Sequence, residues 1–408
     1  MKLLQTETLQ DAREKLFEYM RALPETETVG LADAEGRVLA EEIRCGCDIP
    51  HFRRSTVDGY AVVSRDTQGA GESVPVFLKI VEEVSMGDTA KSVLESGQCA
   101  YVPTGGMLPE GADAVVMVEY CEAFDSARLA VYSSVSPGRN VVQIGEDAEA
   151  GSILLKKGAL LRPQEIGALA SAGCVCVPVF RPLRLTIIST GDELVPPESL
   201  PAPGQIRDVN TYALEALARK RGFETVSRLV LRDGEETLKS AVAEAMEISD
   251  IVAVSGGSSQ GKKDFCAEVL DGLSNPGVFV HGISLKPGKP TILGYDEKSR
   301  TALVGLPGHP AAALLVFELI VVWVKNRLIA QAEARCVYAN MGTNIVGAPG
   351  KTSCLTVRLF EKDGGYIAEP VLGKSGAMSA LTAADGYVLI DINKEGLRKD
   401  ELVKVLLF

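Results

Sequence analysis

S-G-G-S-S-Q-G-K-K-D, residues 255–264, is the stretch on which the prediction of the fold rests. It follows the apolar run 250–254, which predicts a buried strand. A glycine-rich loop at the carboxyl end of a parallel strand is where open α/β sheets bind ligands. Its N–H and O–H groups suit an anion, and the candidate ligands are Gly256, Gly257, Ser258 and Ser259, with Asp264 as a candidate metal ligand. Taken alone, a strand-to-helix turn that needs glycine for its angle is an equally good interpretation.

The surrounding pattern favours the ligand-binding interpretation. Apolar runs that predict strands lie at 183–189, 226–231, 251–254, 278–285, 291–295 and 301–306. Segments with helical spacing lie between and after them, at 210–221, 235–246 and 310–328. Strands that alternate with helices of this length predict a doubly wound, mainly parallel α/β domain over residues 181–330.

The flanking regions have a different character. Short apolar runs separated by turn residues predict a β-rich domain, a small barrel or sandwich, over 28–142 and a C-terminal β-barrel-like domain over 331–408. An amphipathic helix near the N-terminus and the segment 143–180 predict one mixed α/β linker domain, made of residues 1–27 and 143–180. The predicted fold class is therefore multidomain, α/β and β.

Composition narrows the function and the location. The 408 residues carry a net charge of −12 at pH 7, which argues against nucleic-acid binding through a basic surface. The longest apolar run, 311–324, contains Glu318 and is too short to span a bilayer. The N-terminus shows no signal peptide, and the nine scattered cysteines include no C-x-x-C pair. We expect a cytoplasmic protein with reduced thiols and no membrane partner.

Polar motifs follow several strands of the α/β domain, at the point where each strand ends. S-T-G-D-E-L (189–194), Arg232-Asp233, K-P-G-K-P (286–290) and G-L-P-G-H-P (305–310) join the stretch 255–264 at that edge. One crevice would thus collect the carboxylates Asp192, Glu193, Asp233 and Asp264, the lysines Lys286 and Lys289, and the turn prolines Pro307 and Pro310. Carboxylates beside phosphate-facing lysines predict Mg²⁺-dependent phosphate chemistry. Taken singly, each of these acids is better interpreted as a solvated loop residue, and the ligand interpretation depends on all five loops meeting at one edge. His309 could equally be a turn residue.

The common motifs of nucleotide-binding proteins and hydrolases are missing, and two residues of the β-rich region have more than one interpretation. Walker A, complete G-x-G-x-x-G and G-x-S-x-G motifs are absent, which disfavours P-loop NTPases, dehydrogenases and α/β-hydrolases. In the β-rich region, Asp58 is interpreted as a turn residue from its sequence alone. Thr104, in the loop P-T-G-G (103–106), could contact a phosphate or belong to a long hairpin connection.

Taken together, the motifs resemble those of the molybdopterin molybdenumtransferase family, the MoeA and gephyrin E-domain group. The matching stretches cover nearly the whole chain in one order: D-A-E-G-R-V-L-A (33–40), D-I-P-H-F-R-R-S-T-V-D-G-Y-A (48–61), P-T-G-G (103–106), G-A-D-A-V-V (111–116), G-E-D (145–147), S-T-G-D-E-L (189–194), S-G-G-S-S-Q-G-K-K-D (255–264), K-P-G-K-P (286–290), G-L-P-G-H-P (305–310) and K-S-G-A-M-S-A-L (374–381).

The resemblance implies an L-shaped, four-domain subunit in a homodimer, with the active site between the α/β domain of one subunit and the β-rich domain of the other. The implied reaction joins molybdate to adenylylated molybdopterin with Mg²⁺ and releases AMP. Other cofactor-biosynthesis proteins or apo-molybdoenzymes are implied as possible partners.

The resemblance also implies a role for each candidate residue. The region of Mg²⁺, pyrophosphate and pterin would be served by Asp192, Glu193, Asp233 and Asp264. Oxyanions would be held by Lys286 and Lys289, and Ser375 would contribute from the C-terminal domain. Asp58 and Thr104 would reach in from the partner subunit. The resemblance thus makes these residues candidates for catalysis: Asp58, Thr104, Glu193, Asp233 and Asp264. The candidate metal ligands are Asp192, Glu193 and Asp264.

Five positions depart from the family pattern. They are Val57 for Met, Lys262 for an acidic residue, His309 for Asn, Ala312 for Ser and, in a loose alignment, Thr356 for Arg. Because several of these border the family's molybdate pocket, two alternatives stay open. One is a divergent pterin- or nucleotide-binding scaffold or carrier without turnover, and the other is a molybdopterin adenylyltransferase.

Overall fold

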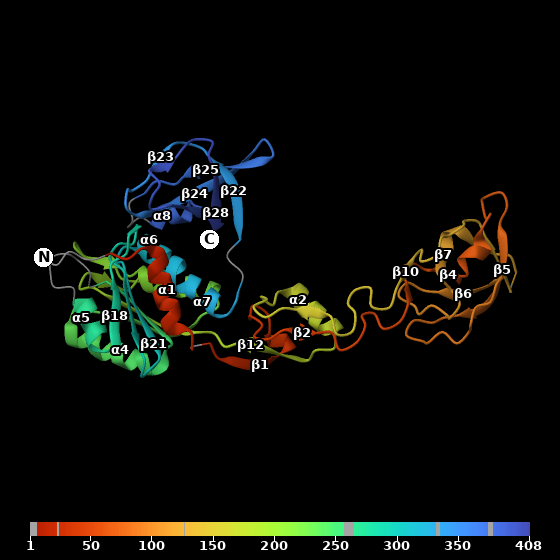
Figure 1. The fold of residues 1–408 in the computed structure, drawn as a ribbon, viewed down its shortest axis with the longest axis horizontal. Helices are drawn as coiled ribbons and strands as arrows, with labels where there is room; N and C mark the ends of the chain where they lie inside the picture. Colours follow the sequence, from red (N-terminus) through yellow and green to blue (C-terminus); the bar gives the residue numbers. More distant parts are fainter. Residues whose placement is uncertain (1–5, 23, 126, 257–264, 332–334, 374–377) are drawn as a thin grey trace.

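The chain folds into an elongated molecule in which a small linker region joins a body to a distant arm (Figure 1). The computed structural model describes residues 6–22, 24–125, 127–256, 265–331, 335–373 and 378–408. In Figure 1 the C-terminal strands lie above the central α/β domain, and the β-rich arm lies at the far end from both.

The centre of the body is a six-stranded sheet. Its strand order is β16 (Glu224–Leu231), β13 (Arg184–Thr190), β17 (Ile251–Ser255), β21 (Thr301–Leu306), β20 (Ile292–Asp296) and β18 (Pro276–His281). β16, β13, β17 and β21 are parallel, whereas β20 runs antiparallel to both of its neighbours. The prediction of a mainly parallel sheet is confirmed.

Helices cover both faces of this sheet because its strands are apolar on both sides. One face packs against α1 (Leu9–Met20), α3 (Asn210–Lys220) and a long helix made of α6 (Pro310–Val316), the π-helical segment η4 (Phe317–Val322) and α7 (Trp323–Leu328). The other face packs against α4 (Glu235–Ile248) and α5 (Phe265–Gly272). The sheet is therefore doubly wound, as predicted.

The C-terminal region is a closed five-stranded barrel. Around it run β24 (Thr352–Lys362), β25 (Gly365–Pro370), β22 (Cys336–Met341), β28 (Leu402–Leu407) and β26 (Gly386–Ile390), and β26 pairs back to β24. The pair β23 (Ile345–Val346) with β27 (Gly396–Leu397) and the helix α8 (Met378–Thr382) complete this region. The barrel encloses its own apolar core, which includes Met341, Val357 and Val405.

The arm is a six-stranded sheet in the order β7 (Ala114–Met117), β4 (Gly59–Val62), β6 (Gln98–Val102), β5 (Val76–Glu83), β9 (Arg128–Val131) and β8 (Cys121–Ala123). It also carries the short helices η2 (Ser64–Thr67) and η3 (Val118–Tyr120). The pair β3 (Arg54–Ser55) with β10 (Val141–Val142) lies where the arm meets the linker. This region is β-rich, as predicted.

The linker region joins distant parts of the sequence. β1 (Thr26–Gly30) pairs with β12 (Cys176–Phe180), and β2 (Ile43–Arg44) pairs with β11 (Ile153–Leu155). The short helix η1 (Leu31–Asp33) and α2 (Pro163–Ser171) lie on these ribbons. None of the helices in the described ranges combines the length and the apolar character that a membrane span requires.

The predicted division into domains stays a prediction, but two packing facts differ from it. α1 was grouped with residues 143–180, yet its buried residues Leu9, Leu16 and Met20 pack into the core of the central sheet. Residues 28–44 were grouped with the arm, yet Ala34 and Leu39 share a core with α2 and β12. The reason is that an amphipathic pattern shows which face of an element is buried but not which neighbour covers it.

An ion network fastens the linker region to the central sheet. Asp250, whose side chain is 7% exposed, accepts from the Arg184 N–H at 2.7 Å and pairs with the Arg181 guanidinium at 3.1 Å. Arg181 also reaches the exposed Glu25. Burial by itself would raise the pKa of Asp250, but the hydrogen bonds from Arg181 and Arg184 outweigh it and hold the pKa below its ordinary value.

We expect Asp250→Asn to lower the free energy of unfolding at pH 7 by about 3 kcal/mol, because it removes the buried negative charge that pairs with the partly exposed Arg181 and Arg184. A lowered folded-state pKa contributes stability above the unfolded value of about 4, and this contribution is lost as the pH falls through the folded value. The difference between variant and wild type should therefore shrink below about pH 4. Urea unfolding at several pH values, followed by the fluorescence of Trp323, the single tryptophan, measures this difference in the free energy of unfolding.

Glu25→Gln is the matched control, since it removes the exposed partner of the same arginine. We expect a change below about 1 kcal/mol. An equal loss in the two variants at pH 7 would contradict the assignment of the stability to the buried carboxylate.

Candidate functional site

A large pocket of about 2110 Å³ lies between the central domain and the C-terminal barrel. The central strands β13, β17 and β21 are parallel, so their carboxyl ends meet at the edge of the sheet that opens into this pocket. Eight of the predicted site residues line it: Asp192, Glu193, Asp233, Gly256, Lys286, Lys289, Pro307 and Pro310. Their roles stay predictions, but the prediction that these loops meet at one place agrees with the geometry.

Acidic side chains form one wall of the pocket. Asp192 and Glu193 follow β13, and Asp233 follows β16 on the neighbouring strand. The Asp192 carboxylate accepts from the N–H of Asp233 at 3.2 Å. The pKa of Asp233 is raised, first by burial and then by the negative charges of Asp192 and Glu193, and a contact with the Thr190 hydroxyl offsets this only in part. A cation bound here would relieve this repulsion.

The oxygen ligands of this wall suit Mg²⁺, which commonly takes one or two carboxylates and completes its shell with phosphate oxygens and water. Within the described ranges, no three His, Cys, Asp or Glu side chains converge on one point as a complete metal site. Among the described residues, Asp192, Glu193 and Asp233 do not form such a site by themselves, so oxygens of a bound ligand or of other residues would complete the shell of an ion there. The candidate metal ligand Asp264 lies outside the described residues.

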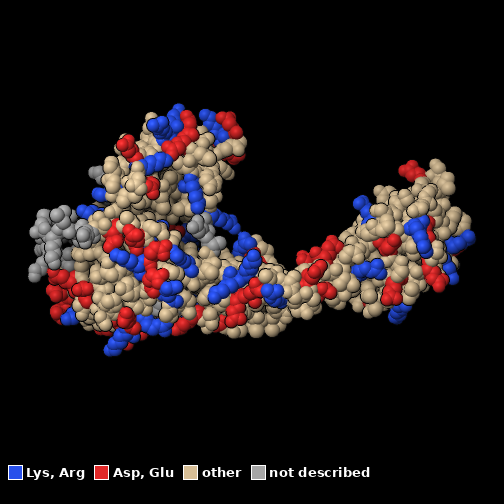
Figure 2. Space-filling model, in the orientation of Figure 1, with Lys and Arg blue, Asp and Glu red and all other residues tan. Residues whose placement is uncertain are grey.

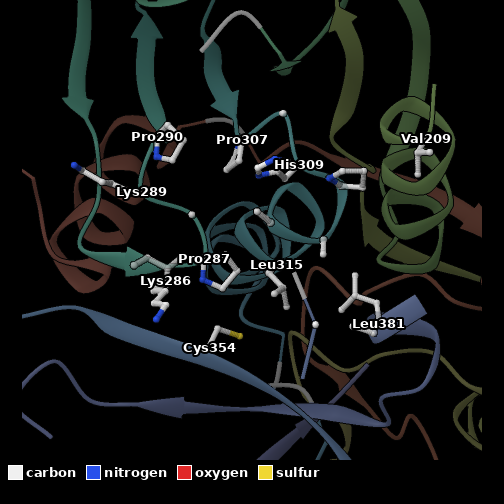
Figure 3. Close-up of a pocket in the computed structure, with 18 of the residues that line it drawn as sticks. Val209, Lys286, Pro287, Lys289, Pro290, Pro307, His309, Leu315, Cys354 and Leu381 are labelled. Atoms are coloured by element: carbon white, nitrogen blue, oxygen red, sulfur yellow. The ribbon is translucent and has the colours of Figure 1, made fainter. Parts of the chain in front are cut away.

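Two lysines stand on the loop between β18 and β20. Lys286 ends the short strand β19 (Leu285–Lys286), and Lys289 follows it. In Figure 3 the Lys286 side chain points toward the C-terminal strand that carries Cys354, whereas Lys289 points away from that strand. Gly288 between them has φ +128°, and an added Cβ would lie 2.7 Å from Val316 Cγ2. The loop can press against α6 only because this residue is glycine.

The first glycine of the stretch 255–264 turns sharply as the chain leaves β17. Gly256 has φ +113°, and an added Cβ would lie 2.2 Å from the Thr190 carbonyl oxygen. Beneath it, the Ser255 hydroxyl accepts from the Asn210 side chain at 2.6 Å and lies 3.3 Å from the Pro307 carbonyl. The candidate residues Gly257, Ser258, Ser259 and Asp264 lie outside the described residues, as does Ser375.

Asp58 and Thr104 do not line this pocket in the same chain. They lie together in the arm, where the Asp58 carboxylate accepts from the Thr104 N–H at 2.7 Å and from its hydroxyl at 3.0 Å. The arm stands well away from the body, with open space between it and the C-terminal barrel (Figure 2). On the face shown, Lys and Arg side chains are interspersed with Asp and Glu over the described residues.

The positions that depart from the family pattern mostly border the pocket. His309, Ala312 and Thr356 line it, and the Thr356 hydroxyl donates to the Val371 carbonyl at 3.0 Å. Val57 is part of the arm core, and Lys262 lies outside the described residues. At position 312 the pocket wall carries a methyl group where the family pattern has a hydroxyl.

Several lining residues were not predicted from the sequence, among them Arg207, Lys351, Ser353 and Cys354. Lys351 adds a further cation, and the buried Cys354 thiol, whose pKa burial raises far above its ordinary value, behaves as an apolar group. Lys351 directly precedes β24, and Ser353 and Cys354 lie at its start. The only signal in the sequence was an isolated lysine before a strand.

Comparisons with known proteins agree with this geometry. Residues 7–173 match the model of the MoeA N-terminal region (domains I and II), residues 186–327 the "Probable molybdopterin binding domain", and residues 338–408 the MoeA C-terminal region (domain IV). The molybdopterin molybdenumtransferase of Haemophilus influenzae is 33% identical over 98% of both chains. That of Bacillus subtilis is 31% identical over 94% of this chain and 90% of its own.

Solved structures show the same architecture. A crystal structure of the molybdopterin biosynthesis MoeA protein of Pyrococcus horikoshii OT3 has a TM-score of 0.83 and 31% identity, covering 99% of this chain and 100% of the other. A second Pyrococcus MoeA structure has a TM-score of 0.79 and 36% identity, covering 99% of both chains. Fold and sequence together define a transferase of molybdenum cofactor biosynthesis. The chain belongs to the MoeA family of molybdopterin molybdenumtransferases.

Proposed function

We propose that this protein inserts molybdate into adenylylated molybdopterin with Mg²⁺ and releases AMP. The observation that carries the proposal is one pocket with an acidic wall and a lysine loop at the carboxyl ends of parallel strands. In an acidic protein, an anionic substrate needs local positive charge, which the lysines and a cation bound at the acidic wall would supply to the phosphates and to the oxyanion. The cytoplasm is the proposed location, with other cofactor-biosynthesis proteins or apo-molybdoenzymes as partners.

The proposed roles follow the charges of the side chains: carboxylates bind the cation and lysines bind the oxyanions. Asp192, Glu193 and Asp264 would hold Mg²⁺ beside Asp233, and this ion would neutralise phosphate charge when bound. Lys286 and Lys289 would hold oxyanions by charge-assisted hydrogen bonds. Gly256 lets the chain turn beside Thr190 where the stretch 255–264 begins, since an added Cβ would meet the Thr190 carbonyl oxygen. Proline neighbours at 287 and 290 restrict the lysine loop.

A second candidate function rests on the pocket wall. Ala312 offers no hydroxyl, and the Thr356 hydroxyl is already engaged with the Val371 carbonyl. These two positions favour a family member that binds a pterin or nucleotide without turnover. The dependence of AMP release on molybdate separates the two functions.

The arm supports a site shared between two subunits. Asp58 and Thr104 are far from the pocket of their own chain, so they would act in the pocket of a partner in a homodimer. Subunit complementation tests this proposal. Asp58→Ala and Lys286→Ala should each lose nearly all activity, whereas a re-associated equimolar mixture should regain about a quarter of wild-type activity, because half of the dimers are mixed and each mixed dimer has one intact site.

The readout is AMP release that depends on molybdate, and the control is each variant denatured and refolded alone. Near wild-type activity in Asp58→Ala alone, or a mixture no more active than its components, would contradict the shared site.

A further inference from the structure

The lysine loop is an excursion from one domain into another. β18 and β20 are neighbours in the central sheet, yet the chain between them runs out through residues 282–291. Within this excursion β19 pairs in parallel with β24, with Leu285 opposite Thr352 and Lys286 opposite Ser353. The strand that carries Lys286 is thus hydrogen-bonded into the C-terminal barrel sheet, although its flanking strands belong to the central domain.

One further backbone hydrogen bond joins the two segments beside this ladder. The Thr352 N–H donates to the Ser284 carbonyl at 2.9 Å. The pairing of β24 with β26 begins one residue later, at Ser353. The Thr352 N–H therefore serves the lysine strand rather than the barrel ladder.

The loop is also held from within. The buried Thr291 hydroxyl donates to the Gly288 carbonyl at 2.7 Å, between the two lysines. The Lys289 carbonyl accepts from the N–H groups of Ile283 and Thr291 at 3.0 and 2.9 Å. Ile283, Leu285 and Thr291 are each at most 1% exposed, so the loop backbone is anchored by burial as well.

We propose that Thr352 and Thr291 are positioning residues for the oxyanion-holding lysines. Thr352 fixes the strand of Lys286 against the C-terminal barrel, and Thr291 fixes the turn that separates Lys286 from Lys289. A lysine is a point charge on a flexible stem, so the place of its backbone sets where the charge can reach. Figure 3 shows Lys286 directed toward the strand that supports it. The inference rests on the proposed function, in which these lysines hold the oxyanion.

Binding of molybdate alone, and of tungstate alone, to the full-length protein tests the inference by calorimetry. Thr352→Pro removes the N–H donor, and Thr291→Val removes the hydroxyl at nearly constant volume. We expect each to weaken oxyanion binding about three- to tenfold, the range for one lost intramolecular hydrogen bond. The KM for molybdate should rise in the same ratio while kcat stays near that of wild type.

The conservative variants Thr352→Ala and Thr291→Ser keep the donor in each case and should bind within about twofold of wild type, well inside the effect of a lost hydrogen bond. If Thr352→Pro does not fold, the comparison of Thr291→Val with Thr291→Ser tests the inference.

Lys286→Ala distinguishes failure of this inference from failure of the proposed function. Wild-type binding in both test variants, with binding lost in Lys286→Ala, would overturn the positioning role alone. Undiminished binding in Lys286→Ala would overturn the lysine's role in the proposed function and this inference with it.

Discussion

Lys286→Ala is expected to lower kcat/KM for molybdate-dependent AMP release about 100- to 1000-fold, the range for removing one preorganised group that stabilises developing or bound negative charge. Lys286 lines the pocket and points toward the C-terminal strands. Its side chain is exposed, so the free energy of unfolding should change by less than about 0.5 kcal/mol. Steady-state kinetics and urea unfolding of the same preparation check both expectations.

Lys298→Ala is the matched control. Lys298 is also an exposed lysine of the central domain, but it lies in the turn between β20 and β21, at the opposite edge of the sheet from the pocket. Its removal should leave kcat/KM unchanged. Equal losses in the two variants would mean that overall charge, rather than the position of Lys286, governs the reaction.

Gly256→Ala is expected to reduce turnover about 100-fold, because a displacement of about 1 Å near the reacting groups has effects of this size. The new Cβ would lie 2.2 Å from the Thr190 carbonyl oxygen and 2.9 Å from its hydroxyl, at a φ of +113° that alanine rarely adopts. Neighbouring backbone must shift, and we expect a loss of ~3 kcal/mol in the free energy of unfolding. The loss of turnover and the loss of stability have the same cause, a displaced backbone at the start of the stretch 255–264.

Gly272→Ala provides the comparison. Gly272 ends α5, its φ is not in the left-handed region, and an added Cβ would meet no atom within 4 Å. The variant should be as active as wild type and equally or slightly more stable, since alanine favours a helix by up to about 1 kcal/mol over glycine. If Gly256→Ala behaved in the same way, the glycine turn would not be needed for the site.

The sequence alone predicted the helices and strands that have a clear local pattern of apolar and turn residues. α3 begins at Asn210 and α4 begins at Glu235, where the predicted helices 210–221 and 235–246 begin. Because parallel strands end at one edge, the strand-end motifs also predicted the pocket that Asp192, Asp233 and Lys286 line. The run 310–328 was predicted as one helix, and its apolar pattern did not reveal the wider π-helical turn at η4.

The remaining features depend on contacts between distant segments. The run 278–285 was predicted as one strand, whereas β18 ends at His281 and β19 is a separate strand of two residues. Its pairing with β24 brings residues 285 and 352 together. The pocket residues at the start of β24 follow from that pairing, which is why Lys351 and Cys354 were not predicted. The packing of α1 on the central sheet has the same origin, since its apolar face fits more than one neighbour.

The most direct test of the proposed function is AMP release from adenylylated molybdopterin by the purified full-length protein with Mg²⁺, with and without molybdate. We predict that release requires molybdate and that the metal is recovered on the pterin. Tight binding of the pterin nucleotide without release, or release that ignores molybdate, would contradict molybdate insertion. The first of these results would instead favour the non-catalytic family member and make Ala312 and Thr356 the residues to revert.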